Sequence, residues 1–340
     1  MKEKLRLWAL VSAAMFASAT YVGSPAVAGY VSFDPPGSNF TWPTRINDTG
    51  TIAGWWFDGN LYHGFVRTPD GSIASFDPPG SVETTPIGMN EKGVIVGTYT
   101  RDNYSPRTYH GFIRDTDGKL KTYDALGDYT SIWAINKTGT MTGHYLDING
   151  SHGFIRDGNH NFTSFDPPGS WGTFPMAINS KGAVTGSYYH DGADACGTFL
   201  IRGFIRAPDG NMTTFDFQNE VSPSSINSHG VVAGSVSDDR CVPEGFVRGS
   251  NGTYQTFEFP GSTNTVNVFD MNEHGTSVGF YWEATWDNPH GFQRTRNGTM
   301  TMIEPDGAYS SQASGINYNG QITGWYIIKK HGLHGFLYTP

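Results

Sequence analysis

Short strand-like runs follow one another along most of the chain, and tight turns that contain Gly separate them. One clear set of four covers residues 175–179, 183–189, 203–207 and 212–216. Runs of this length that are bounded by Gly, Asn and Asp predict β-strands joined by hairpins. The abundance of Gly, Pro and aromatic residues and the low share of charged residues point the same way. We therefore expect an all-β chain.

One motif, Asn-x-x-Gly-x-x-x-Gly, occurs seven times with unchanged spacing. A Gly-Phe pair follows 17 to 24 residues after each motif Asn, and six of these pairs are followed 13 residues later by Asp or Glu. Asn and Gly tolerate the positive φ that short hairpins require. Four strands in a period of about 45 residues are typical of a β-propeller blade. The motifs begin at Asn47, Asn90, Asn136, Asn179, Asn227, Asn272 and Asn317.

The repeat is circularly permuted along the chain. A seventh acidic copy, Asp34, stands before the first Asn motif, whereas the last Gly-Phe pair, at Gly335, is near the end of the sequence. Pairing of the two end segments would remove the free edges of an open array. We predict a seven-bladed β-propeller of four-stranded antiparallel blades over residues 29–340, with the N-terminal strand closing the last blade. A linear solenoid is the alternative, but it would need capping repeats.

Residues 1–28 have the pattern of a signal peptide. Three basic residues precede an apolar run from Leu7 to about Ala19, and Ala26-Val27-Ala28 is a small-x-small cleavage site. A membrane anchor is the alternative, although about a dozen apolar residues are too few to span a bilayer. We expect a secreted protein, either periplasmic or extracellular.

Export favours a disulfide between the two cysteines, Cys196 and Cys241, because the export route is oxidising. They occupy equivalent loops of neighbouring repeats, which supports the pairing. Two buried free thiols are the alternative.

The charge of the chain argues against some partners. Without residues 1–28 the sequence has 19 basic and 30 acidic residues, a formal charge of −11. Nucleic acids and anionic membranes attract clustered Lys and Arg, so neither is an expected partner. No later segment is long and apolar enough to cross a membrane. We expect a monomer that needs no cofactor.

Residues that recur in nearly every repeat are interpreted as architecture. The Phe of each Gly-Phe pair is expected to pack between blades, with a contribution of about 1.5–3 kcal/mol. His residues in separate blades cannot converge on one metal, so no metal site is predicted, and each His is expected to bond the acid of its own repeat. The acids are expected to accept backbone N–H groups in the turn that follows. The His residues are His63, His110, His152, His290 and His334.

The variable loops of such a disc share one face, whereas the tight turns share the other. Binding groups are usually carried by loops on a rigid scaffold, so the variable face is the predicted ligand face. Its aromatic residues are interleaved with Asp, and such a surface suits a sugar, whose C–H faces stack on rings while its hydroxyls form hydrogen bonds. Packing of the loops without any ligand is the alternative.

Two further candidates are near the axis. Arg45 and Asp270 stand where the other repeats have small residues. They are candidates for an axial ion pair or a ligand clamp, and an ordinary channel lining is the alternative. The complete set of candidate ligand-binding residues is Trp42, Arg45, Trp133, Trp171, Phe174, Asp270, Trp282 and Trp286.

The repeat resembles that of an extracellular repeat family known as HAF, in which a His-Ala-Phe core follows an Asn-x-x-Gly element. Here the core reads His-Gly-Phe, for example at His63-Gly64-Phe65, and the resemblance covers almost all of residues 29–340. The resemblance implies an exported repeat protein and supplies no catalytic residue.

We therefore expect a secreted binding module for an extracellular glycan. The sequence contains no Gly-x-Ser-x-Gly, His-Glu-x-x-His or phosphate loop that would identify an enzyme. A secreted polysaccharide lyase or glycoside hydrolase on a propeller scaffold is one alternative, since such enzymes act through pocket carboxylates with Tyr or His. A protein-binding or cell-surface structural role is the other, because aromatic clusters also anchor protein partners.

Overall fold

The computed structural model describes residues 29–102, 107–127, 129–193, 199–216, 220–237, 241–262, 265–283, 288–329 and 332–340. These residues form 28 β-strands and no helix. Within these ranges, therefore, there is no helix of the length and apolarity needed for a membrane span. The predicted signal peptide, residues 1–28, is outside the described residues.

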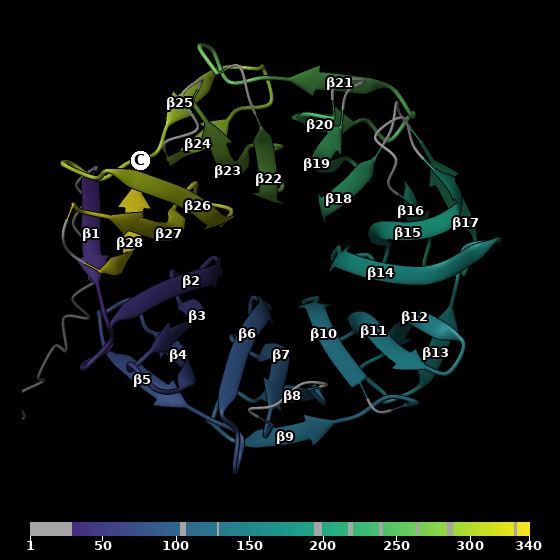
Figure 1. Cartoon of the computed structure of the whole chain (residues 1–340), viewed down its shortest axis with the longest axis horizontal. Coiled ribbons are helices and arrows are strands. Elements are labelled where there is room, and N and C mark those ends of the chain that lie inside the picture. The colour runs from purple at the N-terminus through teal and green to yellow at the C-terminus, as the bar shows by residue number, and fades with distance from the viewer. Residues whose placement is uncertain are drawn as a thin grey trace, which may run out of the picture.

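The strands form a ring of small sheets around a central opening, and each sheet runs outward from it (Figure 1). Antiparallel pairing joins the strands in fours. We call each four a unit and letter its strands A to D from the axis outward. Unit 1 consists of β2 (Phe40–Ile46), β3 (Ile52–Phe57), β4 (Tyr62–Arg67) and β5 (Ile73–Phe76).

The next five units follow in chain order. Unit 2 is β6 (Glu83–Met89), β7 (Ile95–Thr100), β8 (His110–Arg114) and β9 (Leu120–Tyr123); unit 3 is β10 (Tyr129–Ile135), β11 (Met141–Asp147), β12 (Gly150–Arg156) and β13 (Phe162–Phe165). Unit 4 is β14 (Ser170–Ile178), β15 (Val184–Ala193), β16 (Phe199–Arg206) and β17 (Met212–Phe215). Unit 5 is β18 (Val221–Ile226), β19 (Val232–Ser237), β20 (Pro243–Arg248) and β21 (Tyr254–Phe257); unit 6 is β22 (Val266–Met271), β23 (Ser277–Trp282), β24 (Pro289–Arg294) and β25 (Met300–Met302).

Unit 7 takes strands from both ends of the chain. β26 (Ser310–Ile316), β27 (Ile322–Ile327) and β28 (Leu333–Thr339) supply strands A to C, and β1 (Gly29–Phe33) supplies strand D. β1 pairs antiparallel with β28, from Gly29 opposite Thr339 to Phe33 opposite Gly335. This is the pairing that the permuted repeat predicts. The buried ring of Phe33 also lies 6.1 Å from the ring of Phe65 in unit 1, so β1 contacts both neighbouring units.

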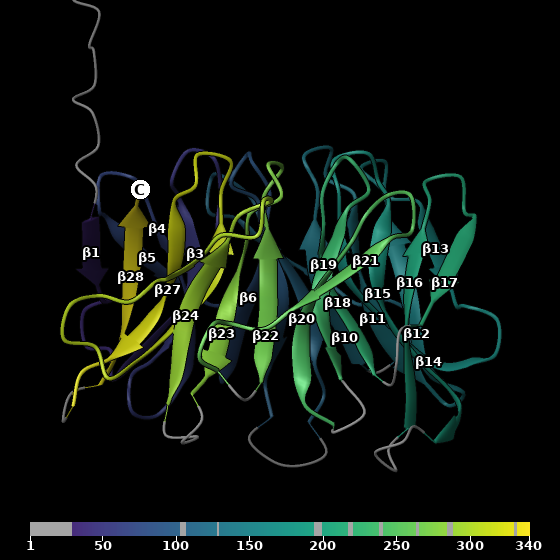
Figure 2. The ribbon, with the colours of Figure 1, turned by 90° about the horizontal axis from the view of Figure 1, so that it is seen from above.

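The predicted runs of unit 4 coincide with its four strands, and the boundaries differ mainly at the variable face. β14 begins at Ser170 instead of residue 175, and β15 continues to Ala193 instead of residue 189. In the side view, β22 runs up toward the face that carries the A–B and C–D turns (Figure 2). The B–C and D–A connections are on the opposite face. We call these the turn face and the loop face.

The two Gly of the repeated motif have different structural roles: the first closes the A–B turn, and the second allows a close backbone approach in strand B. Gly50 has a φ of +84°, and its N–H donates to the carbonyl oxygen of Asn47 at 2.9 Å, which closes the A–B turn. At Gly54 a Cβ would lie 2.3 Å from the carbonyl oxygen of Trp42, where strand A has a bulge. A side chain there would require a backbone shift. The same close approach is found at Gly97, Gly143, Gly186, Gly234, Gly279 and Gly324.

Each motif Asn is buried, and in five of the seven units its amide joins backbone groups of two units. In unit 4, Asn179 Oδ1 accepts the N–H groups of Lys181 and Ala183 at 3.0 and 2.9 Å. Its Nδ2 donates to the carbonyl oxygen of Asn227, the motif Asn of the next unit, at 2.9 Å. Asn317 donates in the same way to the carbonyl oxygen of Asn47, which joins unit 7 to unit 1. The same donation is made by Asn90, Asn136 and Asn272.

The Phe of each Gly-Phe pair is fully buried, as predicted, and most of these rings contact a strand D ring of the preceding unit. The Arg of strand C stacks over that same ring: the guanidinium carbon of Arg67 is 5.0 Å from the centroid of Phe33. A partly desolvated cation–π contact of this kind contributes about 0.5–2 kcal/mol. The stacking recurs at 4.5 to 5.2 Å for Arg114, Arg156, Arg206, Arg248 and Arg294.

We predict that Asn179→Ala strongly destabilises the protein. The substitution leaves the N–H groups of Lys181 and Ala183 without their acceptor and removes one of the two donors to the Asn227 carbonyl. Each group left without a partner costs about 1–3 kcal/mol. Urea denaturation followed by tryptophan fluorescence measures the effect. Asn211→Ala, in an exposed turn where the amide bonds only Asp209, is the matched control. Equal denaturation midpoints for the two variants would contradict the structural role of the buried amide.

We also predict that Phe33→Ala lowers the free energy of unfolding by about 3–5 kcal/mol, because the buried ring joins β1 to unit 1. Val31→Ala, on the same strand but half-exposed, is the control and is expected to have a small effect. Urea denaturation again provides the measurement. If Phe33→Ala behaves like Val31→Ala, the pairing of β1 does not hold the ring together.

Candidate functional site

The repeated His residues bond the acid of their own repeat, as expected. His63 Nδ1 lies 2.6 Å from Asp77, and His152 Nδ1 lies 2.7 Å from Asp166. Both rings also contact a second carboxylate at the loop-face end of strand B: His63 Nε2 is 3.4 Å from Asp58, which directly follows β3, and His152 Nε2 is 3.1 Å from Asp147, the last residue of β11. The first contact recurs for His110, His290 and His334.

The acids have other partners than predicted. In units 3, 6 and 7 the second donor to the carboxylate is a buried hydroxyl of the next unit, not an N–H of the turn that follows. Ser311 Oγ donates to Glu304 at 3.1 Å, and Thr173 and Thr41 donate to Asp166 and Asp34. The expectation of backbone donors was therefore wrong for these acids. Each of them links its own His to the strand A hydroxyl of the following unit.

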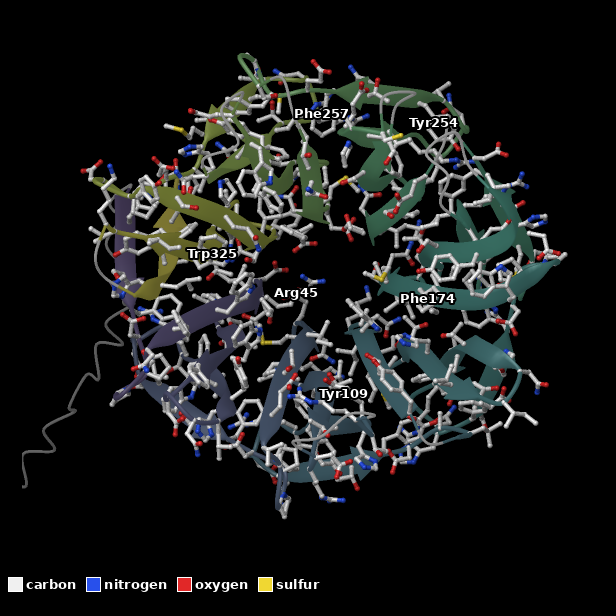
Figure 3. The ribbon with its side chains drawn as sticks, viewed as in Figure 1. Arg45, Tyr109, Phe174, Tyr254, Phe257 and Trp325 are labelled. Carbon is white, nitrogen blue, oxygen red and sulfur yellow. The ribbon has the colours of Figure 1, made fainter. Side chains whose placement is uncertain are left out.

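One sheet face of unit 1 carries a continuous series of aromatic rings. Trp42 is stacked on Trp55, with ring centroids 5.2 Å apart and an interplanar angle of 9°. Trp42 also contacts Trp325 of unit 7 at 5.0 Å. Toward the loop face, Trp55 contacts Tyr62 at 5.6 Å. Figure 3 shows Trp325 in unit 7, on the side of the ring where units 7 and 1 meet. The rings therefore extend from a buried position at the unit boundary to the loop face.

A second aromatic cluster lies between units 3 and 4 around a buried His. Trp133 Nε1 donates to His144 Nδ1 at 3.2 Å, and the His144 ring contacts Phe174 at 5.1 Å. Burial lowers the pKa of His144 to about 4, so its ring is neutral at pH 7. Because Nδ1 accepts the Trp133 proton, Nε2 carries the ring proton. Phe174 continues through Tyr189 to the exposed Trp171.

The two charged candidates are apart from both aromatic groups. Arg45 and Asp270 line an axial cavity of about 460 Å³, which opens among the A–B turns of the turn face. Figure 3 shows Arg45 at the central opening. Asp270 accepts the N–H groups of Met271 and Ile316 at 2.9 and 3.2 Å, whereas Arg45 donates to the carbonyl oxygen of Thr44.

The predicted axial ion pair is not formed. Among the described residues, no nitrogen of Arg45 lies within 4.0 Å of a carboxylate oxygen of Asp270 as an ion pair would require. Burial raises the pKa of Asp270, and the charge of Arg45 and the two N–H donors oppose that shift. The carboxylate of Asp270 is therefore hydrogen-bonded to backbone N–H groups instead of to the guanidinium of Arg45. The two side chains share the cavity lining but are not in contact.

Known proteins resemble this chain in structure but not in sequence. No protein-family model and no curated protein matches the chain. The β-propeller domain of the Trilobed protease from Pyrococcus furiosus aligns with a TM-score of 0.63 at 10% identity, over 88% of this chain and 94% of that one. The chain is a β-propeller. The agreement covers nearly the whole ring, and at this identity it concerns the fold alone.

Two other structures share the propeller's arrangement. A catalytically inactive virginiamycin B lyase from Staphylococcus aureus with quinupristin has a TM-score of 0.60 at 13% identity, over 92% of this chain and 99% of that one. An acylaminoacyl peptidase from Pyrococcus horikoshii has a TM-score of 0.60 at 11% identity, over 89% of this chain and 52% of that one. Their activities belong to those proteins.

The propeller spreads the predicted site residues over several places. Trp42 is in unit 1, the Trp133, Phe174 and Trp171 cluster spans units 3 and 4, and Trp282 is in unit 6. Trp286 and Cys196 lie outside the described residues. The Cys196–Cys241 disulfide therefore stays a prediction. Among the described residues, no group of three or more His, Cys, Asp or Glu is arranged to hold a metal ion.

Sequence reasoning missed Trp55, Tyr62 and His144 as members of the aromatic groups. Trp55 lies directly opposite Trp42 in the pairing of β2 with β3. Cross-strand neighbours on one sheet face can be paired from the sequence once the hairpin register is known. The bulge in strand A shifts that register by one residue, so the motif spacing alone does not give the pairs.

We predict that His63 and His152 make stability depend on pH. Burial lowers the pKa of both rings, but the hydrogen bonds and charges of their two carboxylates outweigh it and raise the pKa above its usual value. This stabilisation is complete below the unfolded-state pKa, about 6.5, and is lost as the pH rises through the higher folded-state pKa.

NMR titration of the imidazole signals tests this prediction. The pKa of His63 should exceed the ordinary His value, and Asp58→Asn should lower it, whereas Asp209→Asn in an exposed turn should not. A His63 pKa at or below the ordinary value would contradict the prediction.

Proposed function

We propose that this protein is a secreted seven-bladed β-propeller of four-stranded blades, latched by β1, that binds a carbohydrate on the loop face of unit 1. The proposal includes the relationship to HAF repeat proteins that the His-Gly-Phe core suggests. The observation that carries it is an exposed pair of rings on a rigid aromatic series: Phe40 is 44% exposed and Tyr62 is 38% exposed.

The rings that pack behind Phe40 and Tyr62 hold these two side chains in place. Phe40 stacks on Phe57, with centroids 5.9 Å apart and planes at 17°, and Phe57 contacts Tyr62 at 4.7 Å. Tyr62 in turn rests on Trp55, which is stacked on Trp42. Rings that are fixed before binding lose little conformational freedom when a ligand stacks on them. A sugar ring needs such a platform for its C–H face.

Polar groups border the platform. Asp58 accepts the N–H groups of Leu61 and Asn60, both at 2.7 Å, and these bonds lower the pKa of Asp58, so the carboxylate is ionised at neutral pH. The side chain of Asn39 lies next to Gly59, on the same rim. A carboxylate and an amide beside a ring offer acceptors and a donor to sugar hydroxyls. An apolar protein anchor would not need this polar border.

Binding is favoured over catalysis by the arrangement of the charged groups. The two carboxylates nearest the platform, Asp58 and Asp77, contact the two nitrogens of His63, so the imidazole ring occupies the space between them that a glycosidic bond would need in a glycoside hydrolase. The lyase and the peptidase among the similar structures support only the fold, at 13% and 11% identity.

The test is a titration of the purified protein with neutral oligosaccharides by calorimetry. We predict that Phe40→Ala and Tyr62→Ala each weaken binding about 2- to 12-fold, since a lost aromatic contact costs about 0.5–1.5 kcal/mol. Tyr318→Ala, an exposed Tyr on the turn face, is the matched control and should leave the affinity unchanged. Absence of binding to every oligosaccharide, or an equal effect of Tyr318→Ala, would refute the proposal.

A further inference from the structure

A groove on the turn face has a charge opposite to that of the protein. Its volume is about 600 Å³, and it lies between units 5 and 6, with the A–B turns and the C–D hairpins of both units as its walls. Figure 3 labels Tyr254 and Phe257 on β21, the unit 5 strand that borders this boundary. The lining includes Lys181, His229, His274, Arg294, Arg296 and Glu273.

The repeats themselves show how this groove differs from its counterparts. Two residues after the strand C Arg, unit 6 has Arg296, where units 1 to 5 have Pro, Thr, Gly, Pro and Ser. The C–D turns of units 5 and 6 carry Asn251 and Asn297, where units 1, 2 and 4 have Asp. The third motif residue is His in units 5 and 6 only. One arginine has therefore been added at this boundary, and the turn carboxylate of units 1, 2 and 4 is replaced by an amide.

The fixed charges of the groove sum to a positive value. Lys181, Arg294 and Arg296 contribute three positive charges against one negative charge from Glu273, in a chain of net charge −9. The carboxylate of Glu273 is already engaged, because it accepts the N–H and the hydroxyl of Ser228 at 2.9 and 2.6 Å. It also lies 3.8 Å from His229. The arginines are therefore left for another anion.

Arg294 is the second, independent indication of a ligand. The residue is only 2% exposed, and its guanidinium carbon lies 4.5 Å from the centroid of Phe257. Arg67, Arg206 and Arg248, in the same position of other units, donate to the next carbonyl oxygen, whereas Arg114 and Arg156, like Arg294, form no such bond within the described ranges. Arg294 has no hydrogen-bond or ion-pair partner among the described residues. Burial of a guanidinium without a hydrogen-bond acceptor costs free energy, and an anion bound in the groove would provide that acceptor.

We propose that this groove binds an acidic oligosaccharide through a uronate carboxylate. The carboxylate would face Arg294 and Arg296, and the sugar hydroxyls would face the neutral polar groups of Ser250, Thr253 and Gln255, which line the same groove. Arginine is suited to this ligand because its planar fork matches a carboxylate. A volume of about 600 Å³ exceeds what a single inorganic oxyanion would fill. The proposal does not rest on the aromatic surface of unit 1.

The experiment is a calorimetric titration of the purified protein with tri-galacturonate, neutral galactotriose and inorganic phosphate. We predict that tri-galacturonate binds and that its affinity falls as salt rises, because the charges are partly exposed. Arg296→Ala, an exposed residue, should weaken binding about 10-fold. Lys119→Ala, an exposed cation on a hairpin of unit 2, is the matched control and should have no effect. Arg294→Lys, which keeps the charge but loses the planar fork, should also weaken binding.

Each other result would overturn the inference. No binding of tri-galacturonate, or binding that Arg296→Ala leaves intact, rules out the groove as the site. Equal affinity for galactotriose removes the role of the carboxylate, and equal affinity for phosphate removes the role of the sugar. Phe40→Ala separates the two sites: it should leave tri-galacturonate binding unchanged, and a loss there would assign the acidic sugar to unit 1. Failure of neutral sugars alone would refute only the carbohydrate site of unit 1.

Discussion

The ring depends on a hydrogen bond from one buried Asn amide to the carbonyl of the next motif Asn, which joins five of the seven pairs of neighbouring units. It is short-ranged and directional, so it fixes both the distance and the angle between the units that it joins. The same amide also closes its own turn through Oδ1, which ties the shape of each unit to its position relative to the neighbour. The acid–hydroxyl contact and the Arg–Phe stacking reinforce the same boundary farther from the axis. A rigid ring follows from these three kinds of repeated contact.

This rigidity explains why binding groups can differ between units without loss of the scaffold. The residues that join the units occupy the motif positions, whereas the aromatic platform of unit 1 and Arg296 of the basic groove use positions that the ring does not need. Phe40 and Arg296 are examples: both are exposed, and neither takes part in a contact between the buried amides. Arg294 belongs to both sets, because it lines the groove and also stacks on Phe257. The two faces can therefore present different chemistry, with stacking surfaces on the loop face and cations on the turn face.

The sequence predicted the strands, the His–acid pairs and the pairing of the chain ends because each depends on local spacing that repeats. It did not predict the donors of the acids or the separation of Arg45 from Asp270. Those depend on which nearby group bonds the carboxylate, and at Asp270 the donors are the N–H of Met271 in its own unit and the N–H of Ile316 in the next unit. The aromatic series was found only in part, because the strand A bulge sets which rings face each other. Trp286 and Cys196 lie outside the described residues.

The β1–β28 pairing joins the first strand to the last, and we expect it to be the last pairing of the ring to form. β1 precedes every other strand, yet its partner is the final strand, so the edge of unit 7 stays open while the intervening units assemble. This contact has the largest sequence separation of any described strand pair, so its loop-closure entropy is the largest and we expect it to form late in folding. Until then Phe33 and the exposed edge of β28 are available to other chains. Exchange of β1 between two copies is the assembly error to which this topology is most prone.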